Sequence, residues 1–155
     1  MNKKKIIISS SDNNYFSLIK ELHLSLKNTE VLSEYDFAIL DTGLDSEQQN
    51  YFKDHNVLIK KAEWNVDVPQ YKILGRENLK TQVARAFLPD YFDNYKLYIW
   101  LDADMWLNDI ESFYYYEKGA LNDKLTIVPQ SDRAYILSLI HISEPTRPER
   151  ISYAV

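Results

Sequence analysis

Two aspartates separated by one residue, Asp102 and Asp104, are the strongest candidates for chemistry in this sequence. They follow the apolar run of residues 95–101, which predicts a buried strand. Where a strand ends, side chains at positions i and i+2 can point to the same side, and two like charges held close together need a cation to stay ionised. Carboxylate oxygens favour Mg²⁺ or Mn²⁺, which bridge to substrate phosphates. We therefore predict Asp102 and Asp104 as metal ligands, with a turn or helix cap as the alternative.

A second polar cluster follows the first apolar run, residues 5–8. It contains Ser10, Asp12, Asn14 and Tyr15, and a predicted helix comes after it. Backbone N–H groups at a helix start suit anions, Asp and Asn side chains can hydrogen-bond a base edge or ribose, and Tyr15 can stack on a base. The glycine patterns of dinucleotide-binding folds and of P-loops are absent. The cluster therefore predicts a nucleotide site of another kind, with a plain helix cap as the alternative.

Further polar side chains lie near other predicted strands. Arg85 and Lys80 are on the helix predicted over residues 77–87, ahead of the strand that ends in the two aspartates. Arg85 can pair bidentately with phosphates or a carboxylate, and Lys80 is a weaker candidate. Gln130 and Asp132 follow the last apolar run, where Asp132 can bind a sugar hydroxyl and Gln130 can face a reacting centre. Ordinary surface or loop positions are the alternative for each of them.

The elements that must position these residues alternate between strand and helix. Short apolar runs predict the strands, and apolar residues at helical spacing predict the helices. The predicted strands are residues 5–8, 36–40, 56–60, 95–101 and 125–128, and the predicted helices are residues 15–26, 45–53, 77–87 and 109–118. This alternation predicts an α/β fold with a mostly parallel sheet and helices on both faces. Ligands bind beyond the carboxyl ends of such strands, so we expect the polar clusters to meet in one crevice.

Composition excludes several classes of protein. The chain has 155 residues, a net charge of −5 and no cysteine. The length fits one domain, the negative charge argues against a nucleic-acid partner, and the lack of cysteine excludes disulfides and thiolate metal sites. No run approaches the ~18 apolar residues of a membrane-spanning helix, and the first apolar run is too short for a signal peptide. We expect no membrane segment and a cytoplasmic protein.

The last part of the chain differs from the rest. The sequence from Leu137 to Arg147 resembles the in-frame translation of a transposase-type sequencing adapter, and residues 151–155 resemble the adapter stretch beyond a sample index. We interpret residues 137–155 as a non-native tail and exclude them from the fold, with a native loop and strand as the alternative. Residues 1–136 are then expected to be the N-terminal part of a longer domain that is C-terminally incomplete.

Several motifs in order resemble the family 8 glycosyltransferases. The S-D-N-N-Y of residues 11–15 resembles the nucleotide-binding start of that family. The R-A-F-L of residues 85–88 and the Y-I-W-L-D-A-D of residues 98–104 resemble its arginine helix and its metal motif. Residues 79–89 and 127–135 are similar to stretches of a bacterial branch of these proteins.

The resemblance implies a GT-A-type nucleotide-diphospho-sugar-binding fold and a hexosyltransferase. It implies retaining transfer of a sugar from a nucleotide-diphosphate donor, usually a UDP-sugar, to an acceptor that is a glycan, a lipid or a protein. The expected cofactor is Mn²⁺ or Mg²⁺. Asp12, Asn14 and Tyr15 would contact the uridine, and Asp102 and Asp104 would hold the metal on the diphosphate, with Asp102 nearer the ribose.

The resemblance also implies roles for the remaining candidates. Arg85 would lie by the phosphates or the donor sugar, and Gln130 and Asp132 would lie near donor or acceptor. Val83 stands where the family usually has Tyr. The family's further metal ligand, a His near its C-terminal end, has no counterpart in residues 1–136. We therefore expect this chain to be an incomplete enzyme with weak or no activity.

Two other functions stay open. A haloacid-dehalogenase-like phosphotransferase also has Asp-x-Asp at a strand end, the first Asp acting as nucleophile and the second as acid/base. That pattern usually follows the first strand and has Thr or Val where this chain has Trp106, and here three predicted strands come first. The other possibility is a nucleotide-sugar-binding module without turnover.

Overall fold

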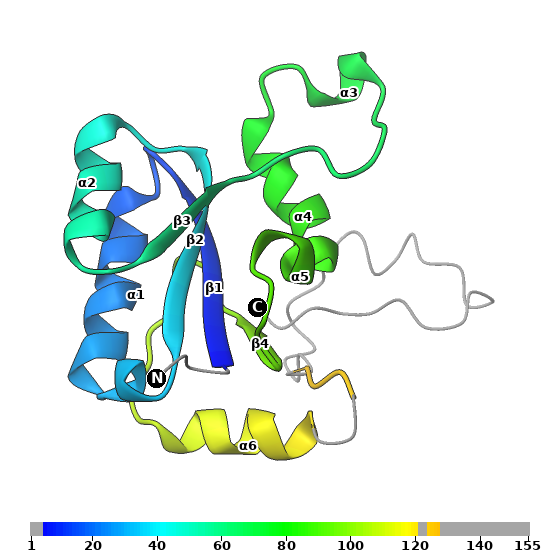
Figure 1. Cartoon of the computed structure of the whole chain (residues 1–155). Coiled ribbons are helices and arrows are strands. Elements are labelled where there is room, and N and C mark those ends of the chain that lie inside the picture. The colour runs from blue at the N-terminus through cyan, green and yellow to red at the C-terminus, as the bar shows by residue number, and fades with distance from the viewer. Residues whose placement is uncertain (1–4, 121–123, 128–155) are drawn as a thin grey trace, which may run out of the picture.

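The chain folds as a parallel β-sheet with helices on both faces, which confirms the predicted α/β class (Figure 1). The computed structural model describes residues 5–120 and 124–127. Within them the sheet has four strands in the order β3-β2-β1-β4, and each neighbouring pair is parallel. The strands are β1 (Lys5–Asp12), β2 (Asp36–Gly43), β3 (Leu58–Lys61) and β4 (Leu97–Trp100). The helices are α1 (Phe16–Asn28), α2 (Ser46–Asp54), α3 (Gln70–Ile73), α4 (Lys80–Ala84), α5 (Leu88–Tyr91) and α6 (Glu111–Gly119), with 3₁₀ turns η1 (Val31–Ser33), η2 (Glu77–Leu79) and η3 (Arg85–Phe87).

Strand β1 has a neighbour on each side and is longer than the sequence predicts. The strand predicted over residues 5–8 continues to Asp12: Ser9 pairs with Ile39 of β2, and Asp12 pairs with Gly43. The predicted end of the strand is wrong because backbone pairing with a neighbouring strand outweighs the weak preference of polar residues for strands. Side chains alternate along a strand, so Ser10 lies on the opposite face from Ser9, and the register shifts between Ser11 and Asp12.

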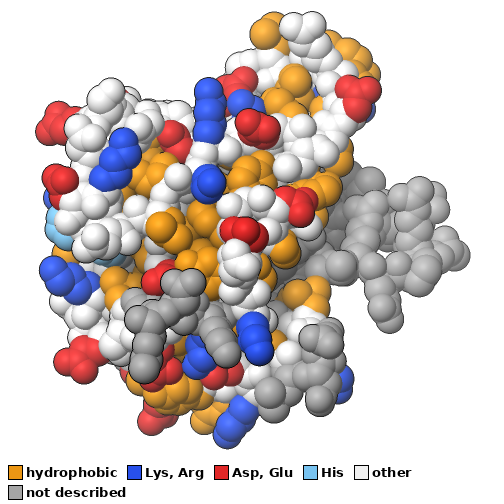
Figure 2. Space-filling view, viewed as in Figure 1, with side chains coloured by type: hydrophobic (Ala, Val, Ile, Leu, Met, Phe, Trp, Pro, Cys, Tyr) orange, Lys and Arg blue, Asp and Glu red, His pale blue; other side chains and the backbone are white. Residues whose placement is uncertain are grey.

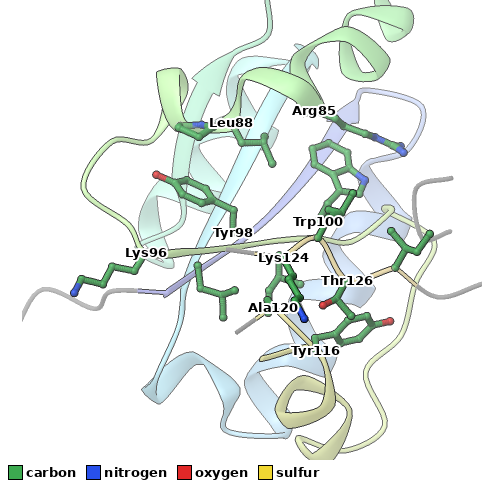
Figure 3. A pocket seen from close by; sticks show the side chains of 14 residues that line it. Arg85, Leu88, Lys96, Tyr98, Trp100, Tyr116, Ala120, Lys124 and Thr126 are labelled. Carbon is green, nitrogen blue, oxygen red and sulfur yellow. The ribbon is translucent and has the colours of Figure 1, made fainter. Parts of the chain in front are cut away.

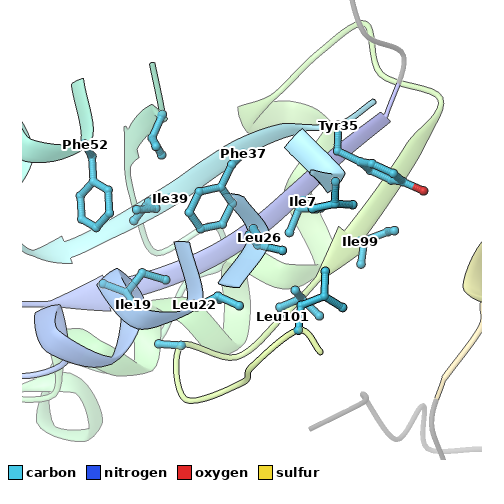
Figure 4. Packing of buried hydrophobic residues seen from close by; sticks show 14 of the residues in the cluster. Ile7, Ile19, Leu22, Leu26, Tyr35, Phe37, Ile39, Phe52, Ile99 and Leu101 are labelled. Atoms are coloured by element: carbon cyan, nitrogen blue, oxygen red, sulfur yellow. The ribbon is translucent and has the colours of Figure 1, made fainter. Parts of the chain in front are cut away.

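Helices α1 and α2 cover one face of the sheet (Figure 1). Figure 4 shows Leu22 and Leu26 of α1 in the same buried cluster as Ile7 of β1 and Phe37 of β2. Helix α2 begins with a capping box around Asp45: the N–H of Gln48 donates to the carboxylate of Asp45 at 2.9 Å, and the Gln48 side chain accepts from the N–H of Asp45 at 3.2 Å. The capping box satisfies backbone donors that the helix leaves open, and it stabilises the start of the helix predicted over residues 45–53.

Helices α4 and α5 cover the opposite face, where Ala84 and Leu88 belong to a second buried cluster with Ile8. The single helix predicted over residues 77–87 is instead the succession η2, α4, η3 and α5. Pro89 does not end the helical segment, because it lies in the first turn of α5, where its missing N–H is not needed. Because Pro89 has no N–H and its ring is bulky, it makes no helical hydrogen bond to the carbonyl of Arg85, four positions earlier. The 3₁₀ turn η3 begins at Arg85.

Helix α6 lies across the amino-terminal end of the sheet (Figure 1). Phe113 buries its ring in the first cluster. Glu117 accepts hydrogen bonds from the hydroxyl of Tyr35 and from Nζ of Lys5, the latter at 2.6 Å. Burial opposes ionisation of Glu117, but these hydrogen bonds outweigh it and lower the pKa of the carboxyl. The Glu117 carboxylate therefore attaches α6 to the starts of β1 and β2.

The segment between β3 and α4 forms an arm that projects from the sheet and carries α3 (Figure 1). Hydrophobic side chains are visible on this arm in Figure 2, and Val66, Tyr71 and Leu74 are exposed. At the other end of the described chain, residues 124–127 form no strand, contrary to the prediction for residues 125–128 as far as the structure describes them. In the part of the chain that the structure describes, every helix is too short or too polar to cross a membrane.

Candidate functional site

The carboxyl ends of β1 and β4 meet beside a polar hollow with a volume of about 280 Å³. The two strands are paired, and the pairing continues beyond β4 through a 3.0 Å hydrogen bond from the N–H of Leu101 to the carbonyl of Ile8. Two polar motifs far apart in the sequence thus share one crevice, as expected for a parallel sheet. The hollow is lined by Ser10, Ser11, Asp12, Tyr15, Thr42, Asn78, Thr81, Gln82, Arg85, Asp102, Ala103 and Asp104.

Asp102 accepts hydrogen bonds from two side chains through the same oxygen. Nη2 of Arg85 donates to Asp102 Oδ1 at 2.5 Å, and Nε1 of Trp100 donates to it at 2.8 Å. The guanidinium carbon of Arg85 lies 4.5 Å from the centroid of the Trp100 ring (Figure 3). The side chains of Arg85 and Asp102 are only 9% and 18% exposed, so solvent ions screen this pair less than a surface pair.

Asp104 lines the same hollow and is exposed to solvent. Among residues 5–120 and 124–127, no group of three or more His, Cys, Asp or Glu side chains is arranged to hold a metal ion. Mg²⁺, however, is usually held by one or two protein carboxylates together with substrate phosphates. Oδ2 of Asp102 makes no hydrogen bond to the described residues. Asp102 and Asp104 therefore fit a hard divalent cation whose coordination is completed by a diphosphate.

Asp12, at the end of β1, shapes the turn into α1. Its Oδ1 accepts a hydrogen bond from the N–H of Tyr15 at 3.1 Å, which closes the turn before α1, but no described side chain caps the helix itself. The Tyr15 ring is 53% exposed and lines the hollow. Asn14 belongs to the same turn but is exposed and does not line the hollow. Its neighbour Asn13 is tied to α2, where its Oδ1 accepts from Nε2 of Gln48 at 2.7 Å.

Ser10 connects β1 to the helical segment on the other side of the hollow. Oγ1 of Thr81 donates to Oγ of Ser10 at 2.9 Å. The sequence analysis missed Thr81, and it also missed Asn78, Gln82 and Thr42, which line the hollow. Helical spacing could have identified two of them. Gln82 and Thr81 are three and four positions before Arg85, so on a helix they lie on the same face as Arg85. The sequence analysis gave Trp100 no role beyond the predicted strand of residues 95–101, but it is half-buried and its N–H donates to Asp102.

The structure does not bring every predicted residue into the hollow. Nζ of Lys80 pairs with Glu77 at 2.5 Å, and Lys80 is absent from the lining. Gln130 and Asp132 lie outside the described residues, as does the tail of residues 137–155.

A second hollow of about 350 Å³ shares Arg85 with the first (Figure 3). Its lining is more apolar and includes Leu88, Tyr98, Trp100 and Tyr116. Arg85 thus stands between a polar hollow that contains the carboxylates and an apolar hollow beside β4.

Comparison with solved structures assigns the fold. Two structures of the galactosyltransferase LgtC are similar to this chain, one of an active-site mutant and one in complex with donor and acceptor sugar analogs. Their TM-scores are 0.52 and 0.51, each at 20% sequence identity over 70% of this chain. The chain spans 41% of the length of LgtC. The parallel sheet flanked by helices is that of the GT-A glycosyltransferase fold, which confirms the predicted fold class. No family model matches the sequence, and no curated protein sequence does.

Proposed function

We propose that this chain is the nucleotide-sugar-binding part of a glycosyltransferase that moves a hexosyl group from a nucleotide-diphosphate donor to an acceptor. The observation that carries the proposal is one polar hollow, at the carboxyl edge of a GT-A sheet, that contains Asp12, Tyr15, Arg85, Asp102 and Asp104. The fold of LgtC, which has been solved with donor and acceptor sugar analogs, supports the same assignment.

The hollow offers a group for each part of a UDP-sugar. The exposed ring of Tyr15 suits stacking on the base, and the carboxylate of Asp12 suits a hydrogen bond to the base or ribose. Asp102 and Asp104 would hold Mn²⁺ or Mg²⁺ at the diphosphate. When bound there, such an ion offsets the charge that develops on a phosphate leaving group. Arg85 brings a permanent positive charge to the same place.

Sugar transfer breaks the bond between the anomeric carbon and the diphosphate oxygen. The diphosphate keeps the electron pair, the acceptor hydroxyl forms the new bond to the anomeric carbon, and the proton that the hydroxyl loses passes to the departing diphosphate oxygen. Arg85 is already held by Asp102 and by the Trp100 ring, so its charge needs little reorganisation to stabilise the leaving oxygen. We propose that the anomeric configuration is retained, as the resemblance to family 8 implies.

Other parts of the proposal concern residues around this centre. Asn14 and Lys80 remain predicted contacts to the nucleotide sugar outside the hollow, and Gln130 and Asp132 remain predicted contacts to donor or acceptor. The acceptor is proposed to be a glycan, a lipid or a protein, and the protein is proposed to act in the cytoplasm. The absence of cysteine is compatible with a reducing compartment.

The phosphotransferase alternative is less well supported. The nucleophilic aspartate of that pattern usually follows the first strand, whereas Asp102 follows β4, the fourth strand along the chain. The fold also matches that of GT-A enzymes. A nucleotide-sugar-binding module without turnover would use the same hollow, so it makes the same prediction for binding.

The experiment that tests the proposal measures UDP binding by the 155-residue chain with Mn²⁺ present and after its removal with EDTA. We expect binding that requires the metal and that Asp104→Asn weakens roughly 10- to 100-fold, because a charge-assisted contact contributes about 1.5–3 kcal/mol. Asp67→Asn is the matched control, since Asp67 is exposed, is absent from the hollow and loses the same charge. Equal binding by the two variants would contradict the assignment of Asp104.

A further inference from the structure

Trp100 is the last residue of β4, two positions before Asp102. Its ring packs against the buried cluster formed by β1, β2 and the α4–α5 side of the sheet. The parallel pairing places Trp100 beside Ile8, whose side chain is fully buried. The ring is therefore anchored against the core, while its N–H reaches Asp102, which lines the polar hollow.

Trp100 contacts two groups of opposite charge with two different parts of its indole. The N–H donates to Oδ1 of Asp102 at 2.8 Å, and the face of the ring lies 4.5 Å from the guanidinium carbon of Arg85 (Figure 3). An indole is the side chain that provides both a donor and a strongly binding π face. Phenylalanine would keep the face and lose the donor, and leucine would lose both.

The donor has a consequence for the orientation of the Asp102 carboxylate. Trp100 and Arg85 both use Oδ1, so the carboxylate is fixed with Oδ2 bonded to none of the residues described. A carboxylate fixed in this way loses little rotational freedom when a cation binds it. Hydrogen-bond partners of metal-binding side chains typically contribute 10- to 100-fold to metal affinity.

We propose that Trp100 is a positioning residue of this site, which orients Asp102 toward a divalent cation and holds Arg85 against the same carboxylate. The role rests on the proposed function, because it concerns how the metal and diphosphate are held. Trp100 is not itself expected to touch the reacting atoms.

The contact itself can be tested without any ligand. The chain has three tryptophans, and the indole N–H signal of Trp100 in a ¹⁵N-correlated NMR spectrum is assigned as the one lost in Trp100→Phe. Asp102→Asn and Arg85→Gln should each shift that signal clearly and leave the signal of Trp106 nearly in place, since Trp106 is 60% exposed and lines neither hollow. A Trp100 signal that moves no more than that of Trp106 would overturn the proposal.

Metal binding then tests the role. We expect Trp100→Phe to weaken Mn²⁺ binding in the presence of UDP by about tenfold, measured by EPR of free Mn²⁺ at a temperature where the variants are folded. The matched control, Trp106→Phe, should bind like the unchanged chain. If Trp100→Phe also binds like the unchanged chain, Trp100 has only a packing role and the proposed function stands. If the unchanged chain binds no Mn²⁺ with UDP, the proposed function falls, and the positioning role falls with it.

Discussion

Replacing Arg85 by Gln should change metal binding and nucleotide binding in opposite directions. In the ligand-free chain Arg85 neutralises Asp102 through a 2.5 Å ion pair that is mostly shielded from solvent. A divalent cation that approaches Asp102 is repelled by the guanidinium, and at about 5 Å with an effective dielectric constant of about 40 to 60 this repulsion is about 2–3 kcal/mol. Arg85→Gln should therefore tighten Mn²⁺ binding without nucleotide by roughly 30- to 150-fold.

The same substitution should weaken UDP binding in the presence of saturating Mn²⁺. Loss of a charge-assisted contact to the diphosphate costs about 1.5–3 kcal/mol, which is roughly 10- to 100-fold in affinity. Both affinities can be measured by calorimetry, with Arg76→Gln as the matched control because Arg76 is exposed and lines neither hollow. If both affinities of Arg85→Gln move in the same direction, or neither differs from the control, Arg85 does not both oppose the free cation and contribute to diphosphate binding.

Three further predictions concern stability. Burial, aided by the nearby charges of His55 and Lys27, lowers the pKa of His23 to about 4. As the pH falls, His23 is therefore protonated in the unfolded chain before it is protonated in the folded chain, and the free energy of unfolding should fall by about 1 kcal/mol between about pH 7 and 5.5. Urea unfolding at each pH measures this loss, which should be absent in His23→Phe. Asp45→Ala should lower the free energy of unfolding by about 1 kcal/mol through loss of the α2 cap, measured by thermal unfolding. Glu117→Gln should lower the free energy of unfolding by about 1 kcal/mol at about pH 7, measured by urea unfolding. Since the pKa of Glu117 is lowered in the folded chain, the difference in the free energy of unfolding between this variant and the unchanged chain should shrink as the pH falls below about 4.

The fold was predictable because local pattern and tertiary contacts agree over most of the chain. The run Ile6–Ile8 is hydrophobic on both sides, and both sides are buried in the parallel sheet. The capping box of Asp45 is a local signal that needs no tertiary information. The serines after Ile8 were misjudged because only the neighbouring strand β2 determines that they are extended. Similarly, the breaks in the helical segment before β4 depend on how Pro89 is accommodated.

Site residues were predictable where the strand that they follow determines their position. They were not predictable where their position depends on how a second element packs. Asp102 and Asp104 follow a strand, and the topology alone brings them near Asp12. The direction of Lys80 depends on the rotation of α4, which the sequence pattern did not determine. The role of Trp100 depends on a partner from another element, Arg85, whose guanidinium lies on its ring.

The pairing of β1 with β4 makes the hollow a late product of folding. Its walls come from β1 and β4, which are neighbours in the sheet but far apart in the sequence. Lys5 of β1, for example, pairs with Leu97 of β4. Contacts of such large sequence separation form slowly, because a long loop must close before they can stabilise the chain. A ligand of the hollow should consequently bind after helical signal has appeared in a refolding reaction, so that ligand uptake reports the docking of β4 in real time.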